Sequence, residues 1–333
     1  MNALLEVEDL VVDIPIPSGM LHPVREISFH VDYGETLCIV GESGCGKSLT
    51  SLAIMGLLPN AASRNAKHLN LEGESLLEIS EAALADLRGN KLSMIFQDPM
   101  TSLNPSYTIG NQLAEVLMRH RGASRSAARD RAVYLLEKVG ISFAASRLGQ
   151  YPHQLSGGLR QRVMIAMALM CEPKLLIADE PTTALDVTIQ AQILLLIQSV
   201  QKEFKIGVIL ITHDLGVVAR VADRVAVMYA GQIVETGTAT EVFEKPLHPY
   251  TQGLIDCIPI PGKTKAGEQL GSIPGIVPNL VGDLSGCSFR DRCDFAQNEC
   301  AGDVSENVLG AGRQFRCILP EELGSRQKLS AEQ

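Results

Sequence analysis

The stretch from Gly41 to Ser48 constrains this chain more than any other, because it fits the phosphate-binding pattern G-x-x-x-x-G-K-[ST]. Residues 35–40, just before it, predict a short buried strand, and residues 47–57, just after it, predict an apolar helix. In such a loop the backbone N–H groups turn toward phosphate oxygens, and the N-terminus of the following helix favours an anion. Strand, loop and helix in this order therefore predict a nucleotide site.

Every position of the loop is a candidate for nucleotide binding, and two side chains have specific predicted roles. Lys47 is expected to reach the β- and γ-phosphates, and the hydroxyl of Ser48 to ligate Mg²⁺. The complete candidate set is Gly41, Glu42, Ser43, Gly44, Cys45, Gly46, Lys47 and Ser48. A glycine-rich turn that carries a lysine by coincidence is the alternative, and the two correct flanks disfavour it.

Composition limits the classes of protein that need to be considered. The 333 residues are enough for one large domain and a smaller one, and 46% of them are hydrophobic. The sequence has no run of about 18 uncharged apolar residues, so we expect no transmembrane helix. The acidic N-terminus does not resemble a signal peptide, which favours a cytoplasmic location. The net charge of −9 disfavours a general nucleic-acid binder.

Strands and helices alternate after the loop. Residues 174–179 and 207–213 predict buried strands, residues 187–204 predict a helix, and residues 224–229 and 232–236 predict a hairpin. Residues 108–147 have a helical pattern that interrupts this alternation, so we interpret them as a helical insertion. Nearer the N-terminus, residues 4–13 and 26–31 predict strands, with a turn at residues 14–19. This alternation predicts an α/β fold with a parallel sheet wrapped by helices.

Two acidic residues follow the buried strand that ends near residue 179. Asp179 stands where a carboxylate holds Mg²⁺ directly or through water, and Glu180 is placed to polarise an attacking water as a general base. An ordinary Asp-Glu turn is the alternative, and the buried run before the pair disfavours it.

At this point the chain resembles the nucleotide-binding subunits of ATP-binding cassette (ABC) transporters. Residues 155–162 are similar to the family signature, and residues 179–182 to its second nucleotide motif. Residues 184–186 are similar to the D-loop, residues 212–214 to the switch histidine, and Gln97 to the Q-loop glutamine. All five elements occur in family order over residues 4–240. The resemblance implies a P-loop NTPase of ABC type, with a parallel-sheet core, an antiparallel β subdomain and a helical insertion.

A finer resemblance points to the dipeptide, oligopeptide and nickel importer branch. It rests on residues 96–105, 151–158 and 248–251, and on the cysteine-bearing tail after residue 280. We therefore expect a nucleotide-binding domain at residues 1–245, with the insertion at about 98–165. Residues 246–333 are expected to form a linker and a small C-terminal appendix of this importer type.

The resemblance also implies a mechanism in which two such domains stack head to tail around two ATP molecules. Ser156, Gly157 and Gly158 would contact the γ-phosphate held by the partner domain, and Asp186 would join the ATP site. Glu180 would activate water, His213 would hold the γ-phosphate and water in line, and Gln97 would sense Mg²⁺ and the water. A strand-end histidine and a surface glutamine are the alternatives for His213 and Gln97.

The function implied is that of the ATP-hydrolysing subunit of a membrane importer for peptides or related small solutes. Its expected partners are a second, homologous ATPase, two membrane permease subunits and, indirectly, an extracytoplasmic binding protein, with the chain peripheral on the cytoplasmic side of the membrane. A soluble ABC ATPase acting on nucleic acid or ribosomes is the alternative, disfavoured by the single cassette and the acidic charge. A metabolic kinase is disfavoured by the signature at residues 156–158.

Two positions depart from the family pattern. The aromatic residue that usually stacks on adenine is replaced by Ile14, so we expect apolar packing there, with His22 nearby. The glutamine that usually closes the signature is Leu159, which we expect to be tolerated because the phosphate contacts come from the preceding residues.

Four of the eight cysteines crowd the last fifth of the chain, at Cys287, Cys293, Cys300 and Cys317. In a cytosolic protein such a group suggests a metal or cofactor more than disulfides. The spacing contains no close C-x2–4-C pair of the kind zinc sites favour, and it resembles tails of peptide-importer ATPases, some of which carry a [4Fe–4S] cluster. A structural or redox-sensing cluster is one interpretation, and zinc or free buried thiols is the other.

Overall fold

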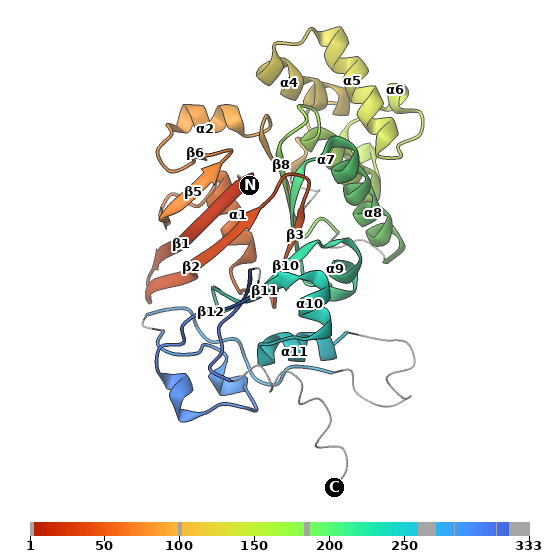
Figure 1. Ribbon diagram of the computed structural model, residues 1–333. Helices are drawn as coiled ribbons and strands as arrows, with labels where there is room; N and C mark the ends of the chain where they lie inside the picture. The colour runs from red at the N-terminus through yellow and green to blue at the C-terminus, as the bar shows by residue number, and fades with distance from the viewer. Residues whose placement is uncertain are drawn as a thin grey trace. The chain divides into compact units, whose positions relative to one another are not determined.

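The protein is described by a computed structural model that covers residues 3–98, 102–182, 187–258, 271–282, 284–310 and 312–319. The chain forms two compact units whose segments alternate along the sequence. The first unit contains residues 1–6, 30–36 and 70–211, and the second contains residues 7–29, 37–69 and 212–333. Figure 1 shows the elements in chain order.

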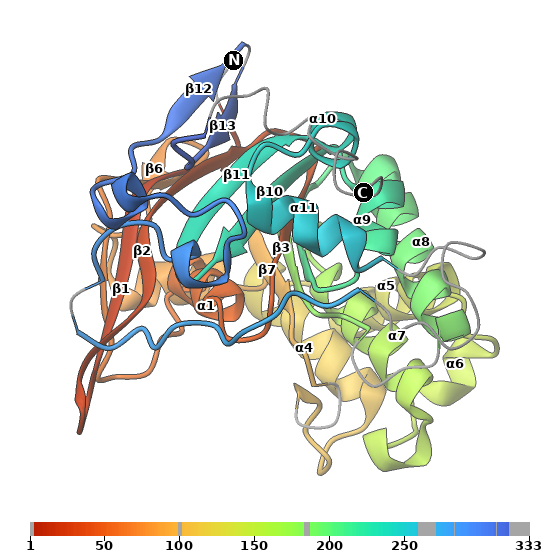
Figure 2. The same ribbon diagram turned by 90° about the horizontal axis from the view of Figure 1, so that it is seen from below.

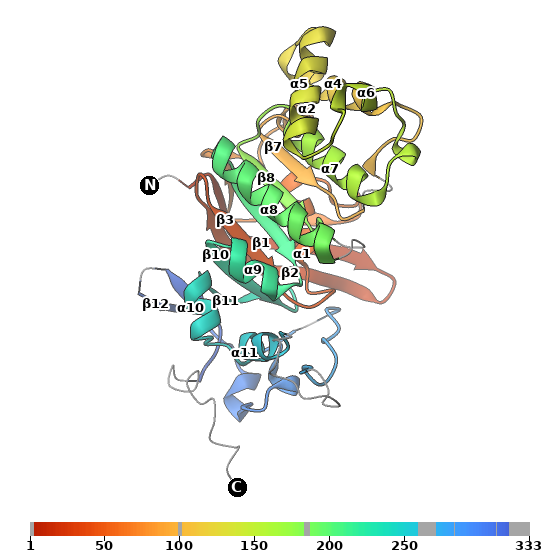
Figure 3. The ribbon, with the colours of Figure 1, turned by 90° about the vertical axis from the view of Figure 1, so that its right-hand side faces the viewer.

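Three parallel strands form the sheet of the first unit. They are β7 (Leu92–Ile95), β8 (Leu175–Asp179) and β9 (Gly207–Thr212, whose last residue belongs to the second unit). Every residue of β8 and β9 is buried. The uninterrupted apolar runs in the sequence predict this burial, because parallel strands are covered on both faces. Helices α7 (Gly157–Ala168) and α8 (Val187–Phe204) run beside these strands (Figure 3).

The helical insertion predicted from residues 108–147 is present in the first unit. It consists of α4 (Ile109–Arg121), α5 (Arg125–Lys138) and α6 (Ala144–Arg147), followed by a 3₁₀ turn η1 (Pro152–Gln154). Thr108 and Ser124 cap α4 and α5 by accepting backbone N–H groups. The apolar face formed by Ala132 and Leu135 is buried against α7 and α4, which gives the insertion its own small core. The unit also holds α2 (Glu81–Leu87) and the short strand β6 (Glu74–Ser75), which pairs with β5 (His68–Leu71).

In the second unit the main sheet has the order β12-β13-β11-β10-β3. Strand β3 (Thr36–Val40) is parallel to β10 (Arg224–Tyr229), which forms an antiparallel hairpin with β11 (Gln232–Thr238). The C-terminal hairpin of β12 (Asn307–Leu309) and β13 (Arg313–Phe315) continues this sheet, because β13 pairs with β11 (Figure 2). The C-terminal tail is therefore joined to the nucleotide-binding sheet by main-chain pairing.

Most of the N-terminal hairpin also belongs to the second unit. Strand β1 (Leu5–Ile16) pairs with β4 (Ser63–Asn65), and β2 is Gly19–Val31. The turn predicted at residues 14–19 is wrong in extent: β1 continues to Ile16 and β2 begins at Gly19. Pro15 and Pro17 suggested the turn, but the fixed φ of proline also suits an extended strand end.

The helices of the second unit are short. They are α1 (Lys47–Met55), α9 (Leu215–Val221), α10 (Ala239–Glu244) and α11 (Pro249–Asp256), with 3₁₀ turns η2 (Arg290–Arg292) and η3 (Asn298–Ala301). No helix within the described ranges combines the length and hydropathy needed to cross a membrane.

Candidate functional site

The phosphate loop lies in the second unit between the fully buried strand β3 and helix α1. Two glycines are required by the space around them. A Cβ on Gly41 would lie 2.1 Å from the carbonyl oxygen of Met228, and one on Gly46 would lie 2.1 Å from that of Pro23. Gly46 also has φ of 104°, which L side chains rarely adopt. The loop is therefore packed tightly against its own unit, with its backbone in a conformation that only glycine takes easily.

Lys47 begins helix α1 and is folded back over the loop. Its side chain is buried, and its ammonium group donates to the carbonyl oxygens of Gly41 at 2.8 Å and Glu42 at 2.9 Å. It also lies 3.7 Å from the thiol sulfur of Cys45, whose pKa is raised by burial. An ammonium has three N–H donors, and Lys47 uses two of them on carbonyl oxygens of the loop, which keeps its positive charge beside the loop. The half-buried Ser48 follows in the first turn of α1, where the helix N-terminus favours an anion.

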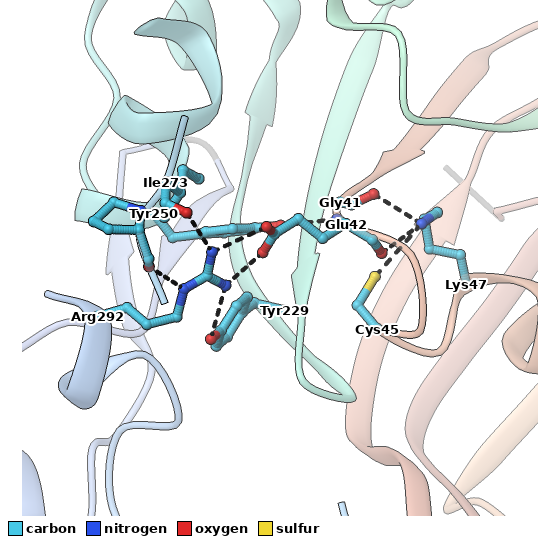
Figure 4. A network of polar contacts seen from close by, with 9 residues as sticks. Gly41, Glu42, Cys45, Lys47, Tyr229, Tyr250, Ile273 and Arg292 are labelled. Carbon is cyan, nitrogen blue, oxygen red and sulfur yellow. Dashed lines mark hydrogen bonds and ion pairs between the residues drawn. The ribbon is translucent and has the colours of Figure 1, made fainter. Parts of the chain in front are cut away.

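Glu42 is held by residues that the sequence patterns did not identify (Figure 4). Its backbone N–H donates to the hydroxyl oxygen of Tyr250 at 2.9 Å. Its carboxylate accepts two hydrogen bonds from the guanidinium of Arg292, Nη1 to Oε2 at 2.7 Å and Nη2 to Oε1 at 3.0 Å. Tyr250 lies in the stretch 248–251 that carried the importer resemblance, whereas no local pattern marks Arg292 as a partner of the loop.

The two predicted carboxylates lie in the first unit at the end of β8. Asp179 is the last residue of the strand and its side chain is buried. Glu180 has a left-handed backbone with φ of 44°, and its N–H donates to the carbonyl oxygen of Ile211 at 3.0 Å. Gln97, just after β7, donates from Nε2 to Oε2 of Glu180 at 3.1 Å. The structure thus brings together Gln97 and Glu180, which are 83 residues apart in sequence.

The signature segment of the first unit begins helix α7. Ser156 caps the helix by accepting the N–H of Leu159 at 3.4 Å, and both Ser156 and Gly157 are exposed. The N-terminus of α7 therefore begins with two exposed residues, and a helix N-terminus favours an anion. Leu159 is half-buried, and its backbone N–H is the group that Ser156 accepts.

His213 is exposed and belongs to the second unit, one residue beyond the end of β9. Asp214 beside it caps α9 by accepting the N–H groups of Gly216 and Val217. Asp186 lies outside the described residues. His22 forms a contact of 2.6 Å between Nδ1 and the carboxylate of Asp13, next to the half-buried Ile14.

The four clustered cysteines line one small cavity in the second unit, together with His248 and Phe289. Burial raises the pKa of the thiols of Cys287 and Cys293, and raises that of Cys317 to about 11. All four thiols are free of disulfide bonds. Within the described part of the chain, no three His, Cys, Asp or Glu side chains are arranged to hold a metal ion.

Comparison with known proteins gives two family matches. The model described as ABC transporter matches residues 24–183, and the one described as Oligopeptide/dipeptide transporter, C-terminal region, matches residues 234–300. The chain is 50% identical over 328 residues to the dipeptide transport ATP-binding protein DppD of Escherichia coli K12, covering 98% of this chain and 100% of the relative. It is 54% identical over 297 residues to the oligopeptide transport ATP-binding protein OppD of Bacillus subtilis, covering 89% and 83%.

Solved structures point the same way. A dimeric bacterial ABC transporter cassette superposes with a TM-score of 0.63 at 26% identity, covering 71% of this chain and 98% of that one. This likeness confirms the predicted fold class.

Proposed function

Because the chain belongs to the family of ABC transporter ATP-binding proteins, it is an ATPase, and we propose that its ATP hydrolysis drives peptide import across a membrane. The support for peptide cargo is 50% identity along nearly the whole chain to a dipeptide transport protein, together with the oligopeptide/dipeptide C-terminal region. Dipeptides, longer peptides and related small solutes all fit this class. The observation that carries the mechanism is the hydrogen bond between Gln97 and Glu180 at the end of β8.

In this proposal the loop N–H groups and Lys47 bind the phosphates of ATP, and Mg²⁺ is held by Ser48 and Asp179, with Gln97 sensing it. Glu180 accepts a proton from the attacking water. Two features support it: Glu180 directly follows the fully buried strand β8, and the amide of Gln97 donates a hydrogen bond to its carboxylate.

The signature at Ser156, Gly157 and Gly158 is proposed to bind the γ-phosphate held by a second ATPase domain. His213 is proposed to hold the γ-phosphate and the attacking water in line, and Asp186 to join the ATP site. The support for the signature contact is a helix N-terminus at which Ser156 and Gly157 are exposed. The second ATPase is a homologue, and two membrane permease subunits receive the motion through the helical insertion. The chain is then peripheral on the cytoplasmic face, and an extracytoplasmic binding protein delivers the solute.

Glu180→Gln tests the ATPase step. The amide keeps the shape of the side chain but cannot take a proton, so kcat should fall by about 10²- to 10⁴-fold while MgATP still binds. Glu137→Gln is the matched control. It makes the same chemical change, at an exposed residue of α5. A kcat for Glu180→Gln within tenfold of the wild type would remove Glu180 from the role.

Purification of tagged Glu180→Gln protein from detergent-solubilised membranes with ATP and Mg²⁺ tests the transport step. Two multi-span membrane proteins and a second ATPase should copurify. A homodimer alone, or a complex with ribosomes or nucleic acid, would leave the ATPase standing and overturn peptide import.

For the cysteine cavity we propose a [4Fe–4S] cluster ligated by Cys287, Cys293, Cys300 and Cys317. The support for this proposal is that four free thiols line one small cavity, and four thiolates are the ligand set of such a cluster. Zinc or free buried thiols is the alternative, and the described residues show no group of three such side chains placed around one metal ion of any kind. When bound, the cluster would supply structural or redox-sensing chemistry apart from ATP hydrolysis. Anaerobic purification should yield iron and sulfide in equal amounts, whereas one zinc per chain would refute the cluster.

A further inference from the structure

Glu42 is the second residue of the phosphate loop, and the binding pattern does not require any particular side chain there. A carboxylate at this position carries a negative charge into a loop whose task is to accept phosphates. Like charges repel, and the repulsion grows as the site is shielded from water. The chain therefore needs a cation for Glu42 that does not take up the phosphate-binding groups themselves.

Arg292 is that cation, and it comes from the C-terminal tail, 250 residues away in sequence. Its side chain is only 4% exposed, and the two guanidinium–carboxylate contacts of 2.7 and 3.0 Å form a bidentate pair (Figure 4). Charge-assisted, bidentate pairs of this kind are strong and fix orientation as well as distance. Lys47 donates to the backbone carbonyl oxygens of Gly41 and Glu42, whereas Arg292 donates to the carboxylate of Glu42.

The guanidinium is fully engaged. Besides Glu42, it donates from Nε to the carbonyl oxygen of Pro274 at 2.8 Å, from Nη2 to that of Ile273 at 3.1 Å, and from Nη1 to the hydroxyl of Tyr229 at 3.3 Å. With the two bonds to Glu42 this matches the five N–H donors of an arginine. The pKa of Arg292 is raised, chiefly by its hydrogen bonds to Glu42, so the cation is permanent.

Aromatic packing fixes the same region from a second direction. Tyr229, Tyr250 and Phe289 form a cluster with ring centroids 4.5 to 5.4 Å apart. Tyr250 accepts the backbone N–H of Glu42, so the main chain and the side chain of this loop residue are both held from outside the loop. Phe289 also lines the cysteine cavity, and Arg292 directly precedes Cys293.

We propose that Arg292 is a positioning residue for the phosphate loop, which neutralises Glu42 and thereby sets the affinity of the loop for the nucleotide. The C-terminal tail then controls ATP binding through one ion pair. The inference rests on the proposed nucleotide-binding role of the loop, and it adds a residue that the cassette patterns do not contain.

The test measures binding of MgADP, which is not hydrolysed, to the purified full-length chain by isothermal titration calorimetry. Arg292→Gln removes the cation that pairs with Glu42. The Kd for MgADP should therefore rise about tenfold, which corresponds to roughly 1.4 kcal/mol. Arg290→Gln is the matched control, because it removes the same charge two residues earlier in the chain. The side chain of Arg290 contacts Asp291 and Ser285, and not Glu42. Its Kd should stay within twofold of the wild type.

A charge effect is separated from a merely structural one by the double variant Glu42→Gln/Arg292→Gln. Once Glu42 is neutral, loss of Arg292 should change Kd by less than threefold relative to Glu42→Gln alone. A wild-type Kd in Arg292→Gln, or a tenfold loss that persists when Glu42 is neutral, would overturn the proposal. If Arg292→Gln fails to fold by circular dichroism, the double variant against Glu42→Gln still decides.

The two proposals fail in different ways. A wild-type chain that does not bind MgADP would remove the nucleotide site itself, whereas equal binding by the wild type and Arg292→Gln would remove only the role of Arg292.

Discussion

The burial of His248 makes the stability of the second unit depend on pH. His248 caps α11, is 1% exposed, and accepts the N–H of Tyr250 on Nδ1 at 3.1 Å. Protonation would place a hydrogen on Nδ1 where another donor already points, and burial lowers the pKa of the imidazole to about 3. In the unfolded chain the pKa is about 6.5.

The sign and size of the effect follow from these two values. Between about pH 6.5 and pH 3 the unfolded state binds more protons than the folded state, so the free energy of unfolding falls as the pH falls. The slope is about 1.4 kcal/mol per pH unit. Between pH 7 and pH 5 the contribution of His248 should therefore decrease by about 2 kcal/mol, and it is fully present only above about pH 6.5.

His248→Asn provides the comparison, because asparagine can still cap the helix but does not titrate. Urea unfolding of both proteins is followed by far-UV circular dichroism, since the chain has no tryptophan. The difference in unfolding free energy between wild type and variant should shift by about 2 kcal/mol between pH 7 and pH 5. A difference that stays constant to within about 0.5 kcal/mol would refute the reasoning that burial keeps His248 neutral.

Two further predictions concern packing in the same unit. Gly46→Ala places a Cβ about 2.1 Å from the carbonyl oxygen of Pro23, at a backbone φ of 104°. MgADP binding should therefore be lost while circular dichroism still shows a folded chain. Normal affinity for MgADP would contradict this crowding. Arg313→Met leaves the fully buried carboxylate of Glu235 without its ion pair of 2.9 Å, although two backbone N–H groups still hold it. Amide hydrogen exchange of β13 should therefore accelerate about 100-fold, the lower end of the cost of a broken buried pair. Arg316→Met, on a half-buried neighbour, is the control and should leave exchange near the wild-type rate.

Local sequence patterns were sufficient to predict most of the helices and strands that carry the candidate site residues. The helix predicted at residues 187–204 is α8 with the same bounds, and the strands predicted near residues 175 and 207 are β8 and β9. These predictions succeed because apolar periodicity and turn residues act over a few neighbours. The N-terminal turn was predicted too long, because proline suits both a turn and a strand end, and only strand pairing decides between them.

The sequence by itself determined the phosphate loop, the order of the cassette patterns and the candidate residues Lys47, Asp179 and Glu180, since each depends on residue types at fixed spacing. Only the tertiary structure decided that β13 joins the sheet through β11, and that Arg292 forms an ion pair with Glu42. An ion pair leaves no periodic trace in the sequence, because its partners meet through folding of segments that are far apart in the chain. The tail is thus tied to the loop by contacts between distant residues, which no short stretch of sequence encodes.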